Sequence, residues 1–357
     1  MEKRLYVNFH VLQTVPPSCV NRDDTGSPKT AVYGGVTRAR VSSQSWKHAM
    51  RKAFLENGLF DKNDIGQRTK KIREMIADEI KKLDPEKDAE KLAKKAVDNA
   101  GINYDEKKGV AKALFFMSYA QAKALAELAV AGSEDKKEYK AALAKTPSVD
   151  IALFGRMAAD DATLNYDAAS QVAHSISTHA VQNEYDYFTA VDDRGDEDNA
   201  GAAHLGTTEY NSSTLYRYAT VNVVDLEKQL GREKAAETVR GFAEAFICSM
   251  PMGKQNSFAN RTLPDAVYVT IREDQPINLC GAFEKAVPKS AEGYVEASKV
   301  ALKKYAEQVY KTFADVPSKS FVTGTGMTEL GEAVNLKTLL SELEKTVTEM
   351  LEKNEVE

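Results

Sequence analysis

A long run of amphipathic helical sequence most constrains the fold of this 357-residue chain. Over residues 59–147, apolar side chains recur at helical spacing, with breaks near Pro85 and Gly101. This spacing is typical of helices that bury one face. The most apolar helix is expected over 110–131, and a lysine-rich helix is expected over 135–146. The pattern therefore predicts a helical subdomain that is inserted between two other parts of the chain.

The segments on either side of this insertion contain strand-like sequence. Residues 4–12 place Leu5, Val7 and Phe9 at alternate positions, which indicates a strand with one buried face. Further strands are expected at 148–157, 215–225 and 265–272, and helices at 43–57 and 232–249. Without the insertion, this order is β-α-β-β-α-β, the ferredoxin-like arrangement that RNA-recognition folds share.

We therefore predict an α+β fold with three parts. A ferredoxin-like (RRM-like) domain combines residues 1–58 and 148–330, and the helical insertion of residues 59–147 separates its two segments. Apolar side chains at helical spacing, from Leu336 to Leu351, predict a C-terminal helix within 331–357 that packs on the core of the same chain.

Basic residues are concentrated at the start of the chain. The formal net charge is −5, yet residues 1–52 carry nine Lys or Arg against three Asp or Glu. A basic island on an otherwise acidic protein suggests one face that binds a polyanion. We expect Arg38 and Arg40 to add charge to this face, just before the helix at 43–57.

The composition also excludes several classes of protein. Three cysteines are present, widely spaced and without a C-x-x-C pair, so neither a disulfide framework nor a zinc knuckle is expected. No apolar run is long enough for a signal-peptide core or a bilayer span. We therefore expect a cytoplasmic protein that has no membrane partner.

The helix that follows Ser42 carries one polar stripe. At about 100° per residue, Gln44, Lys47 and Arg51 fall within an arc of roughly 60°, opposite the apolar side chains. Ser42 and Ser43 are candidate N-caps, and the free N–H groups and dipole of a helix N-terminus favour an anion. Phosphates of a nucleic acid fit this surface. The alternative is an ordinary solvated basic face.

Two other segments could carry chemistry. The adjacent carboxylates of Asp23 and Asp24 could hold Mg²⁺ for phosphodiester cleavage, although adjacent acids in a loop more often cap turns. The acidic segment 183–201 could touch nucleic acid by stacking Tyr187 or Phe188 on bases, or it could be a solvated loop. No P-loop, nucleophile elbow or zinc-binding helix motif is present, so we expect no catalytic set, no metal and no cofactor.

Blocks of sequence that run in order along most of the chain carry a specific resemblance. They are P-P-S-C-V-N-R-D-D (16–24), Y-G-G (33–35), R-A-R-V-S-S-Q-S-W-K-H-A-M-R-K (38–52), D-I-A-L-F-G-R-M (150–157), I-S-T-H-A-V (176–181), Y-F-T-A-V-D-D (187–193), A-H-L-G-T-T-E-Y (203–210), P-M-G-K-Q-N-S-F-A (251–259) and C-G-A-F-E-K-A-V (280–287). They strongly resemble the CasC family, the repeated backbone subunits of type I-E CRISPR Cascade complexes. The helical insertion and the C-terminal helix match this family weakly.

The resemblance implies a protein shaped like a right hand, with a ferredoxin-like palm, helical fingers and a β-hairpin thumb at about 180–212. Copies of such subunits polymerise along CRISPR guide RNA, and each copy grips the backbone in a palm groove. The thumb of one copy reaches towards its neighbour and displaces a nucleotide at regular intervals. The other nucleotides stay available for pairing with a target DNA strand, which supplies the sequence specificity. Further implied partners are other Cascade subunits and a target-cutting nuclease.

By position, the resemblance assigns three sets of contacts. The residues that grip the RNA backbone are Arg22, Ser42, Gln44, Lys47 and Arg51. The residues that wedge around the displaced nucleotide are Met157, Phe188 and Thr189. The residues that match lysines contacting incoming duplex DNA are Lys136, Lys137 and Lys140.

We therefore expect a non-catalytic filament subunit that binds guide RNA. Two alternatives stay open. One is a metal-dependent ribonuclease or target-cleaving CRISPR backbone protein that uses Asp23 and Asp24. The other is a general coat protein for single-stranded RNA.

Overall fold

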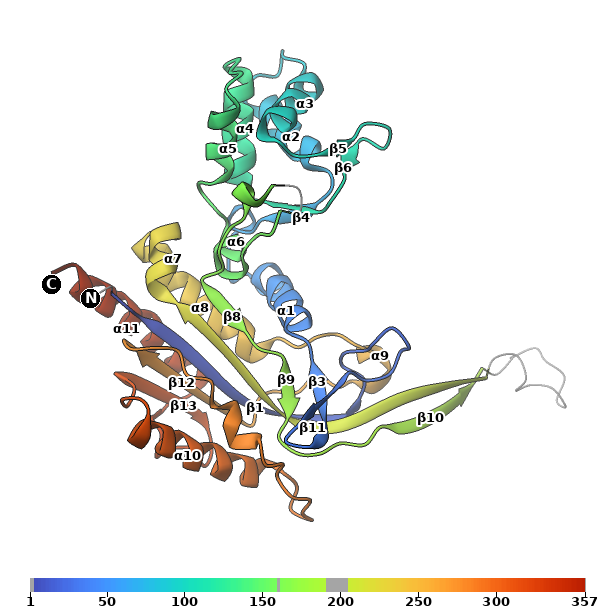
Figure 1. The fold of residues 1–357 in the computed structure, drawn as a ribbon, viewed down its shortest axis with the longest axis vertical. Coiled ribbons are helices and arrows are strands. Elements are labelled where there is room, and N and C mark those ends of the chain that lie inside the picture. The colour runs from blue at the N-terminus through green and yellow to red at the C-terminus, as the bar shows by residue number, and fades with distance from the viewer. Residues whose placement is uncertain (1–2, 159–160, 191–204, 357) are drawn as a thin grey trace, which may run out of the picture.

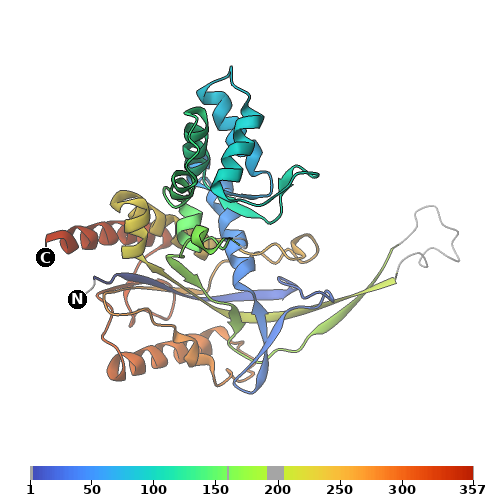
Figure 2. The same cartoon turned by 45° about the horizontal axis from the view of Figure 1, so that its top comes forward.

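The computed structural model has an α+β fold with one large mixed sheet, from which a helical unit and a long hairpin project (Figure 1). It describes residues 3–158, 161–190 and 205–356. The tip of the predicted thumb hairpin lies outside these residues. Figure 2 shows from a second direction that the helical unit rises from one side of the sheet, whereas the hairpin extends away from it.

The main sheet is built around two long strands. Its strands are β1 (Tyr6–Ser18), β2 (Thr30–Tyr33), β3 (Val36–Val41), β8 (Ser170–Val172), β9 (Ser175–Ser177), β10 (Glu184–Thr189), β11 (Leu205–Asn222), β12 (Ala266–Arg272), β13 (Lys319–Gly324) and β14 (Glu332–Ala333). In the described residues they follow the order β14-β13-β12-β1-β11-β9-β3-β2, and β8 and β10 also pair with β11. β1 pairs antiparallel with both β11 and β12, so the N-terminal strand lies in the middle of the sheet.

The strand β11 belongs to both the sheet and the hairpin. From Ser213 to Asn222 it pairs with β1, and from Leu205 to Tyr210 it pairs with β10. The register with β1 shifts where β1 ends, between Val15 and Ser18. One continuous strand therefore runs from the core of the sheet into the projecting hairpin.

Helices cover both faces of the sheet. They are α1 (Ser43–Glu56), α6 (Val149–Phe154), α7 (Val223–Leu230), α8 (Arg232–Cys248), α9 (Gln255–Phe258), η3 (Leu279–Phe283), α10 (Val295–Thr312) and α11 (Leu336–Val356). One face packs on α1, α8 and α11, whereas the opposite face packs on α10 and η3. None of the helices in the described residues is long and apolar enough to cross a membrane.

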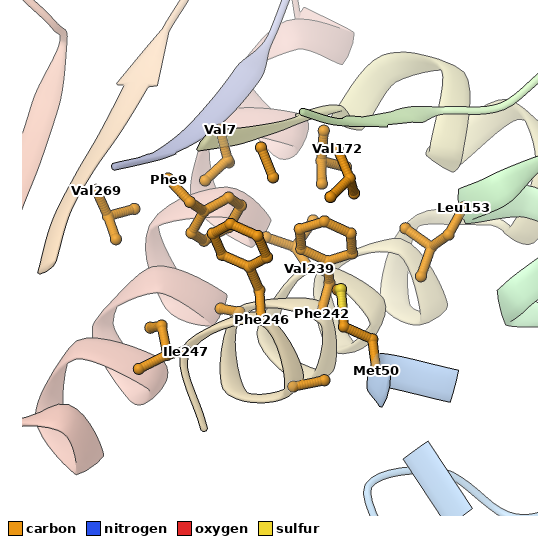
Figure 3. Close-up of a cluster of buried hydrophobic side chains, with 14 of the residues drawn as sticks. Val7, Phe9, Met50, Leu153, Val172, Val239, Phe242, Phe246, Ile247 and Val269 are labelled. Carbon is orange, nitrogen blue, oxygen red and sulfur yellow. The ribbon is translucent and has the colours of Figure 1, made fainter. Parts of the chain in front are cut away.

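The core on the first face follows the predicted alternation of β1. Val7 and Phe9 point into it together with Phe242 and Phe246 of α8 and Met50 of α1 (Figure 3). The ring of Phe9 lies 5.4 Å from that of Phe242 and 6.0 Å from that of Phe246, between ring centroids. Val7 and Phe9 lie on one buried face as predicted, but the strand is buried on both faces rather than one, because Asn8, His10 and Leu12 are buried on the other.

A buried arginine joins the elements of this core. The guanidinium carbon of Arg217, on β11, lies 3.8 Å from the ring centroid of Trp46 and 4.6 Å from that of Phe246. Its Nη1 donates to Gln13 Oε1 at 2.6 Å, and its Nη2 donates to the carbonyl oxygen of Phe246 in the last turn of α8. Burial lowers the pKa of Arg217 to about 9. Since carbonyl groups at a helix C-terminus carry partial negative charge, the helix end takes the place of a carboxylate.

The opposite face of the sheet holds a buried histidine. His10 Nδ1 is hydrogen-bonded to Tyr216 Oη at 2.8 Å, and its ring stacks on Tyr268 with centroids 5.4 Å apart. Burial, together with the charge of Arg272, lowers the pKa of His10 to about 3. The side chain is therefore neutral in the folded protein at neutral pH.

The inserted segment forms a core of its own. Its elements are η1 (Lys62–Asp64), β4 (Gln67–Thr69), α2 (Ile72–Leu83), α3 (Ala89–Ala100), β5 (Tyr104–Asp105), β6 (Val110–Ala111), β7 (Phe115–Met117), α4 (Tyr119–Val130), α5 (Lys136–Leu143) and η2 (Ala162–Leu164). Buried apolar residues between 72 and 143 pack together with Leu164. Arg156, also buried, donates to the carbonyl oxygens of Leu143 at 2.9 Å and Leu164 at 2.8 Å.

One predicted element is wrong, and another begins later than expected. Residues 148–157 were expected to form a strand, but Val149–Phe154 form the helix α6. A short, fully buried apolar run has no periodicity that separates strand from helix. The helix expected over 110–131 begins only at Tyr119, because Ser118 and Gln121 form a capping box there and the preceding residues form β6 and β7.

In other parts of the fold, the structure has more helices and strands than the sequence predicted. No element was predicted between the strand at 4–12 and the helix at 43–57, where the structure has the end of β1 and the hairpin of β2 and β3. No element was expected between the strand at 265–272 and the C-terminal helix, where the structure has α10 and β13. The helix at 43–57, the helix at 232–249 and the C-terminal helix are confirmed, within a few residues at each end.

Replacing Arg217 by alanine is expected to lower the free energy of unfolding by roughly 3–5 kcal/mol, because it leaves a cavity and removes the donors to Gln13 and to the end of α8. Urea unfolding followed by circular dichroism measures this change. Arg261→Ala, at an exposed position, is the control and should change the free energy by about 0.5 kcal/mol at most. If Arg217→Ala lowers the free energy of unfolding no more than the control does, Arg217 does not hold these elements of the core together.

The free energy of unfolding is also expected to fall on acidification between pH 6.5 and about pH 3 because of His10. In that range the unfolded chain binds a proton that the folded chain does not, which costs up to about 1.4 kcal/mol per pH unit. In His10→Phe this contribution is absent, so its free energy of unfolding should fall less steeply with pH than that of the wild type. Parallel curves of the free energy of unfolding against pH for the two proteins would show that His10 does not titrate as described.

Candidate nucleic-acid interface

The N-terminus of α1 is tied to two neighbouring segments. Ser42 is the N-cap, and its Oγ accepts from the backbone N–H of Ser45 at 3.3 Å. The N–H of Ser42 donates to Asn21 Oδ1 at 2.9 Å, which connects the helix to the loop that carries Arg22. The N–H of Ser43 donates to His174 Nδ1 at 3.0 Å. Of the two predicted N-cap candidates, Ser42 is the cap and Ser43 is the first residue of the helix, and the helix N-terminus is less open to an anion than expected.

His174 can accept this hydrogen bond because its ring is neutral. Burial lowers the pKa of His174 below its usual range, and the nearby charges of Arg40 and Lys29 lower it further. Nothing in the sequence around His174 indicated this role, because the contact joins residues 131 positions apart.

The polar stripe of α1 faces the inserted segment. Gln44 is exposed, and Lys47 and Arg51 are half-buried. Lys47 Nζ lies 5.5 Å from the ring centroid of Phe154. Arg51 Nε lies 2.8 Å from Asp150 Oδ2, and its guanidinium carbon is 4.6 Å from the ring centroid of Phe116. The structure thus brings Lys47 and Arg51 to one seam, where Arg51 already has a carboxylate partner.

Asp150 connects three elements at this seam. Its side chain is fully buried, and besides the Arg51 guanidinium it accepts from the Gly66 N–H at 2.8 Å and the Ser148 hydroxyl at 2.7 Å. A Cβ atom at Gly66 would lie 2.6 Å from Ser148 Oγ and 3.0 Å from the carbonyl oxygen of Met117, so only glycine fits. We define the palm–finger seam as the surface formed by Lys47, Arg51, Arg68, Phe116, Asp150 and Phe154.

Two arginines expected near the site have backbone partners. Arg38 is buried, and its guanidinium donates to the carbonyl oxygens of Ser177 at 2.9 Å and Phe283 at 2.8 Å. The expectation that Arg38 adds charge to the surface is therefore wrong, because its side chain points inward from β3. Arg40 is half-buried, and its Nε donates to the carbonyl oxygen of Thr30 at 3.1 Å.

The loop before β2 lines an open groove. Arg22 and Asp24 are exposed there, and the groove, of about 630 Å³, lies between this loop, one side of α1 and residues 251–253. Asp23 Oδ1 accepts from the N–H of Thr25 at 3.0 Å, its hydroxyl at 2.7 Å, and the N–H of Ser27 at 3.0 Å. These hydrogen bonds, above all that from the Thr25 hydroxyl, lower the pKa of Asp23.

The predicted wedge residues are exposed and lie on different parts of the chain. Met157, which is 84% exposed, follows α6, whereas Phe188 and Thr189 belong to β10 of the hairpin, which runs away from α6 (Figure 1). Phe188 lies opposite Gly206, where a Cβ atom would come within 2.3 Å of the Phe188 ring. Glycine at that position lets the ring lie across the hairpin. Within one copy, the structure does not bring Met157 and Phe188 together.

The finger lysines lie on α5. Lys136 and Lys137 are exposed. Lys140 Nζ forms an ion pair of 2.7 Å with Asp161 Oδ2, and this contact together with Thr163 lowers the pKa of Asp161 to about 2. The charge of Lys140 is therefore partly compensated within the chain. Within the described residues, no three His, Cys, Asp or Glu side chains gather so that they could hold a metal ion.

Comparison with solved structures defines the class of this protein. The chain is similar to one in "CRISPR RNA-guided surveillance complex, pre-nicking", with a TM-score of 0.77 and 30% identity over 95% of this chain and 100% of that chain. It is also similar to one in "CRISPR RNA-guided surveillance complex", with a TM-score of 0.63 and 29% identity over 94% of this chain and 99% of that chain. Both are assemblies guided by RNA, and the predicted resemblance to Cascade backbone subunits is confirmed.

The particular family follows from the sequence. Residues 7–351 match the model of the CT1975-like protein family, so the chain belongs to that family. No curated protein matches the chain. Assignment to type I-E stays a prediction.

Proposed function

We propose that this protein is a non-catalytic backbone subunit of a type I-E Cascade complex in the cytoplasm. It polymerises along CRISPR guide RNA, grips the phosphate backbone and displaces periodic nucleotides so that the others can pair with target DNA. The observation that carries the RNA-binding part is the position of Lys47, a cation with no ion pair among the described residues, on a stripe with exposed Gln44. The similarity to chains of RNA-guided complexes supports guide RNA over a general single-stranded RNA as the ligand.

The topology supports a ferredoxin-like palm. β12, β1, β11 and β9 are neighbours in that order and pair antiparallel throughout, with α1 and α8 on one face. This is the strand order that two interleaved β-α-β units produce. The inserted helices then correspond to fingers, and the β10–β11 hairpin corresponds to a thumb.

The separation of the wedge residues supports a filament. Met157 and Phe188 are both exposed yet lie apart in one copy. A nucleotide held between them would have to lie between the hairpin of one copy and the α6 region of its neighbour. Other Cascade subunits, the target DNA strand and a target-cutting nuclease complete the proposed set of partners.

The hydrogen bonds of Asp23 support a non-catalytic role. Three donors from Thr25 and Ser27 converge on one oxygen of this carboxylate, which is the usual arrangement of an aspartate that caps a turn. A metal-dependent nuclease would need carboxylate oxygens for the ion, and this oxygen already accepts three hydrogen bonds.

Lys47→Met should weaken the binding of a uridine oligonucleotide and lower the slope of log affinity against log salt by about 0.7, the value of one phosphate contact on a single strand. Methionine keeps most of the apolar stem that covers Phe154. Fluorescence anisotropy over a salt series measures both quantities. Lys311→Met is the matched control, because it removes one exposed charge from α10, which packs on the opposite face of the sheet from α1. Equal slopes of log affinity against log salt for the two variants would contradict the assignment of Lys47 to a phosphate contact.

Incubation of the purified protein with Mg²⁺ should leave both guide RNA and target RNA intact, because no metal-binding group of carboxylates is expected at the loop of Asp23. Denaturing gel electrophoresis over time checks this. Cleavage that disappears in Asp23→Ala would favour the ribonuclease alternative.

A further inference from the structure

A third cation lies at the palm–finger seam and comes from the inserted segment. Arg68 is on β4, which pairs antiparallel with β7 and places Arg68 directly opposite Phe116. The guanidinium carbons of Arg51 and Arg68 lie 4.6 Å and 5.1 Å from the centroid of this one ring. Lys47 reaches the same seam from α1. Cations from two separate cores therefore meet around Phe116 and Phe154.

The charges at this seam are not balanced. Asp150 is its one carboxylate, and Arg51 and two neutral donors already bind it. Neither Lys47 nor Arg68 forms an ion pair within residues 3–158, 161–190 and 205–356. The seam thus carries two cations in excess of its acids.

The fold holds these cations in an unfavourable setting. Burial lowers the pKa of Lys47, and the charge of Arg68 lowers it further. Arg68 is exposed at the surface, but neighbouring protein atoms partly desolvate its guanidinium, which lowers its pKa, and the charge of Arg51 adds to this effect. Like charges repel more strongly where protein atoms replace water. The attraction of an anion bound at this point would offset both the cost of desolvating the two cations and the repulsion between them.

The side chains at this seam suit a phosphate. A guanidinium offers paired donors to phosphate oxygens, and an ammonium adds a compact charge beside it. Arg68 is exposed, so a ligand can reach it from solvent. The stripe continues from Lys47 to Gln44 one turn earlier on α1, which suits a chain of phosphates that follows the helix.

We propose that Lys47 and Arg68 together bind one phosphate of the guide RNA backbone across the palm–finger seam. The proposal rests on the proposed function and adds a residue and a consequence to it. Lys47 belongs to α1, whose Trp46 and Met50 lie in the core of the main sheet, whereas Arg68 belongs to the inserted segment. A phosphate held by both residues links the two parts, so guide RNA stabilises the position of the helical insertion relative to the sheet.

Arg68→Met tests this site in the full chain. It is expected to weaken binding of the uridine oligonucleotide by about tenfold and to lower the salt slope by about 0.7, as for Lys47→Met. Lys81→Met is the control, since Lys81 is exposed on α2 of the same inserted segment. The double variant Lys47→Met/Arg68→Met should lose less affinity than the product of the single losses, because both act on one phosphate. If the loss of affinity in the double variant equals the product of the two single losses, the two residues do not share one phosphate and the proposal is overturned.

Thermal unfolding separates ligand binding from a structural role. Without RNA, Arg68→Met should unfold at the wild-type temperature or above it, since a repelling cation is removed. With saturating RNA, its rise in unfolding temperature should be smaller than that of the wild type. A lower unfolding temperature without RNA, with an unchanged salt slope, would make Arg68 a structural partner of Phe116 and overturn the proposal. If Arg68→Met alone has the affinity and salt slope of the Lys81→Met control, the shared site is wrong and the proposed function stands. If Lys47→Met also resembles the control, the RNA-binding role that the proposed function gives to the α1 stripe fails.

Discussion

The contact between the Arg217 guanidinium and the Trp46 ring determines how α1 sits on the sheet. The guanidinium carbon is 3.8 Å from the ring centroid, while the indole N–H donates to Ser175 Oγ at 2.9 Å. One face and one edge of the ring are therefore held by β11 and β9. Because α1 turns by about 100° per residue, holding Trp46 sets the direction of Lys47 and Arg51 as well. The orientation of the stripe that is proposed to bind RNA therefore follows from a contact inside the core.

Buried arginines without carboxylate partners recur in this fold. Arg38, Arg156 and Arg217 all donate to backbone carbonyl oxygens, several of which lie at the ends of helices. Aromatic rings also lie beside each of them. Since such a cation bonds to peptide groups of distant segments, it can join elements without introducing an acid near an RNA-binding surface. The basic residues of the sequence thus serve two purposes, and only some of them reach solvent.

The sequence could predict those features that depend on local pattern. The cap at Ser42, the stripe of α1 and the buried face of β1 follow from spacing alone, and the structure contains all three. The strand expected at 148–157 failed because a continuous apolar run suits either a strand or a helix. Arg38 was misplaced because its inward direction depends on the pairing of β3 with β9. Arg68 was missed for a similar reason, as its position at the seam depends on the pairing of β4 with β7, nearly fifty residues apart.

The long strand β11 gives the hairpin a mechanical relation to the core. It has 18 residues, which corresponds to roughly 60 Å at about 3.4 Å per residue. Its inner part is hydrogen-bonded to β1 and its outer part to β10, and the ladder changes partner next to the register shift near Ser213. Because the strand is continuous, a small rotation of its inner ladder at that shift would become a larger displacement of Phe188. In the proposed filament, the step between successive subunits would then depend on the packing of a core far from the proposed RNA contacts.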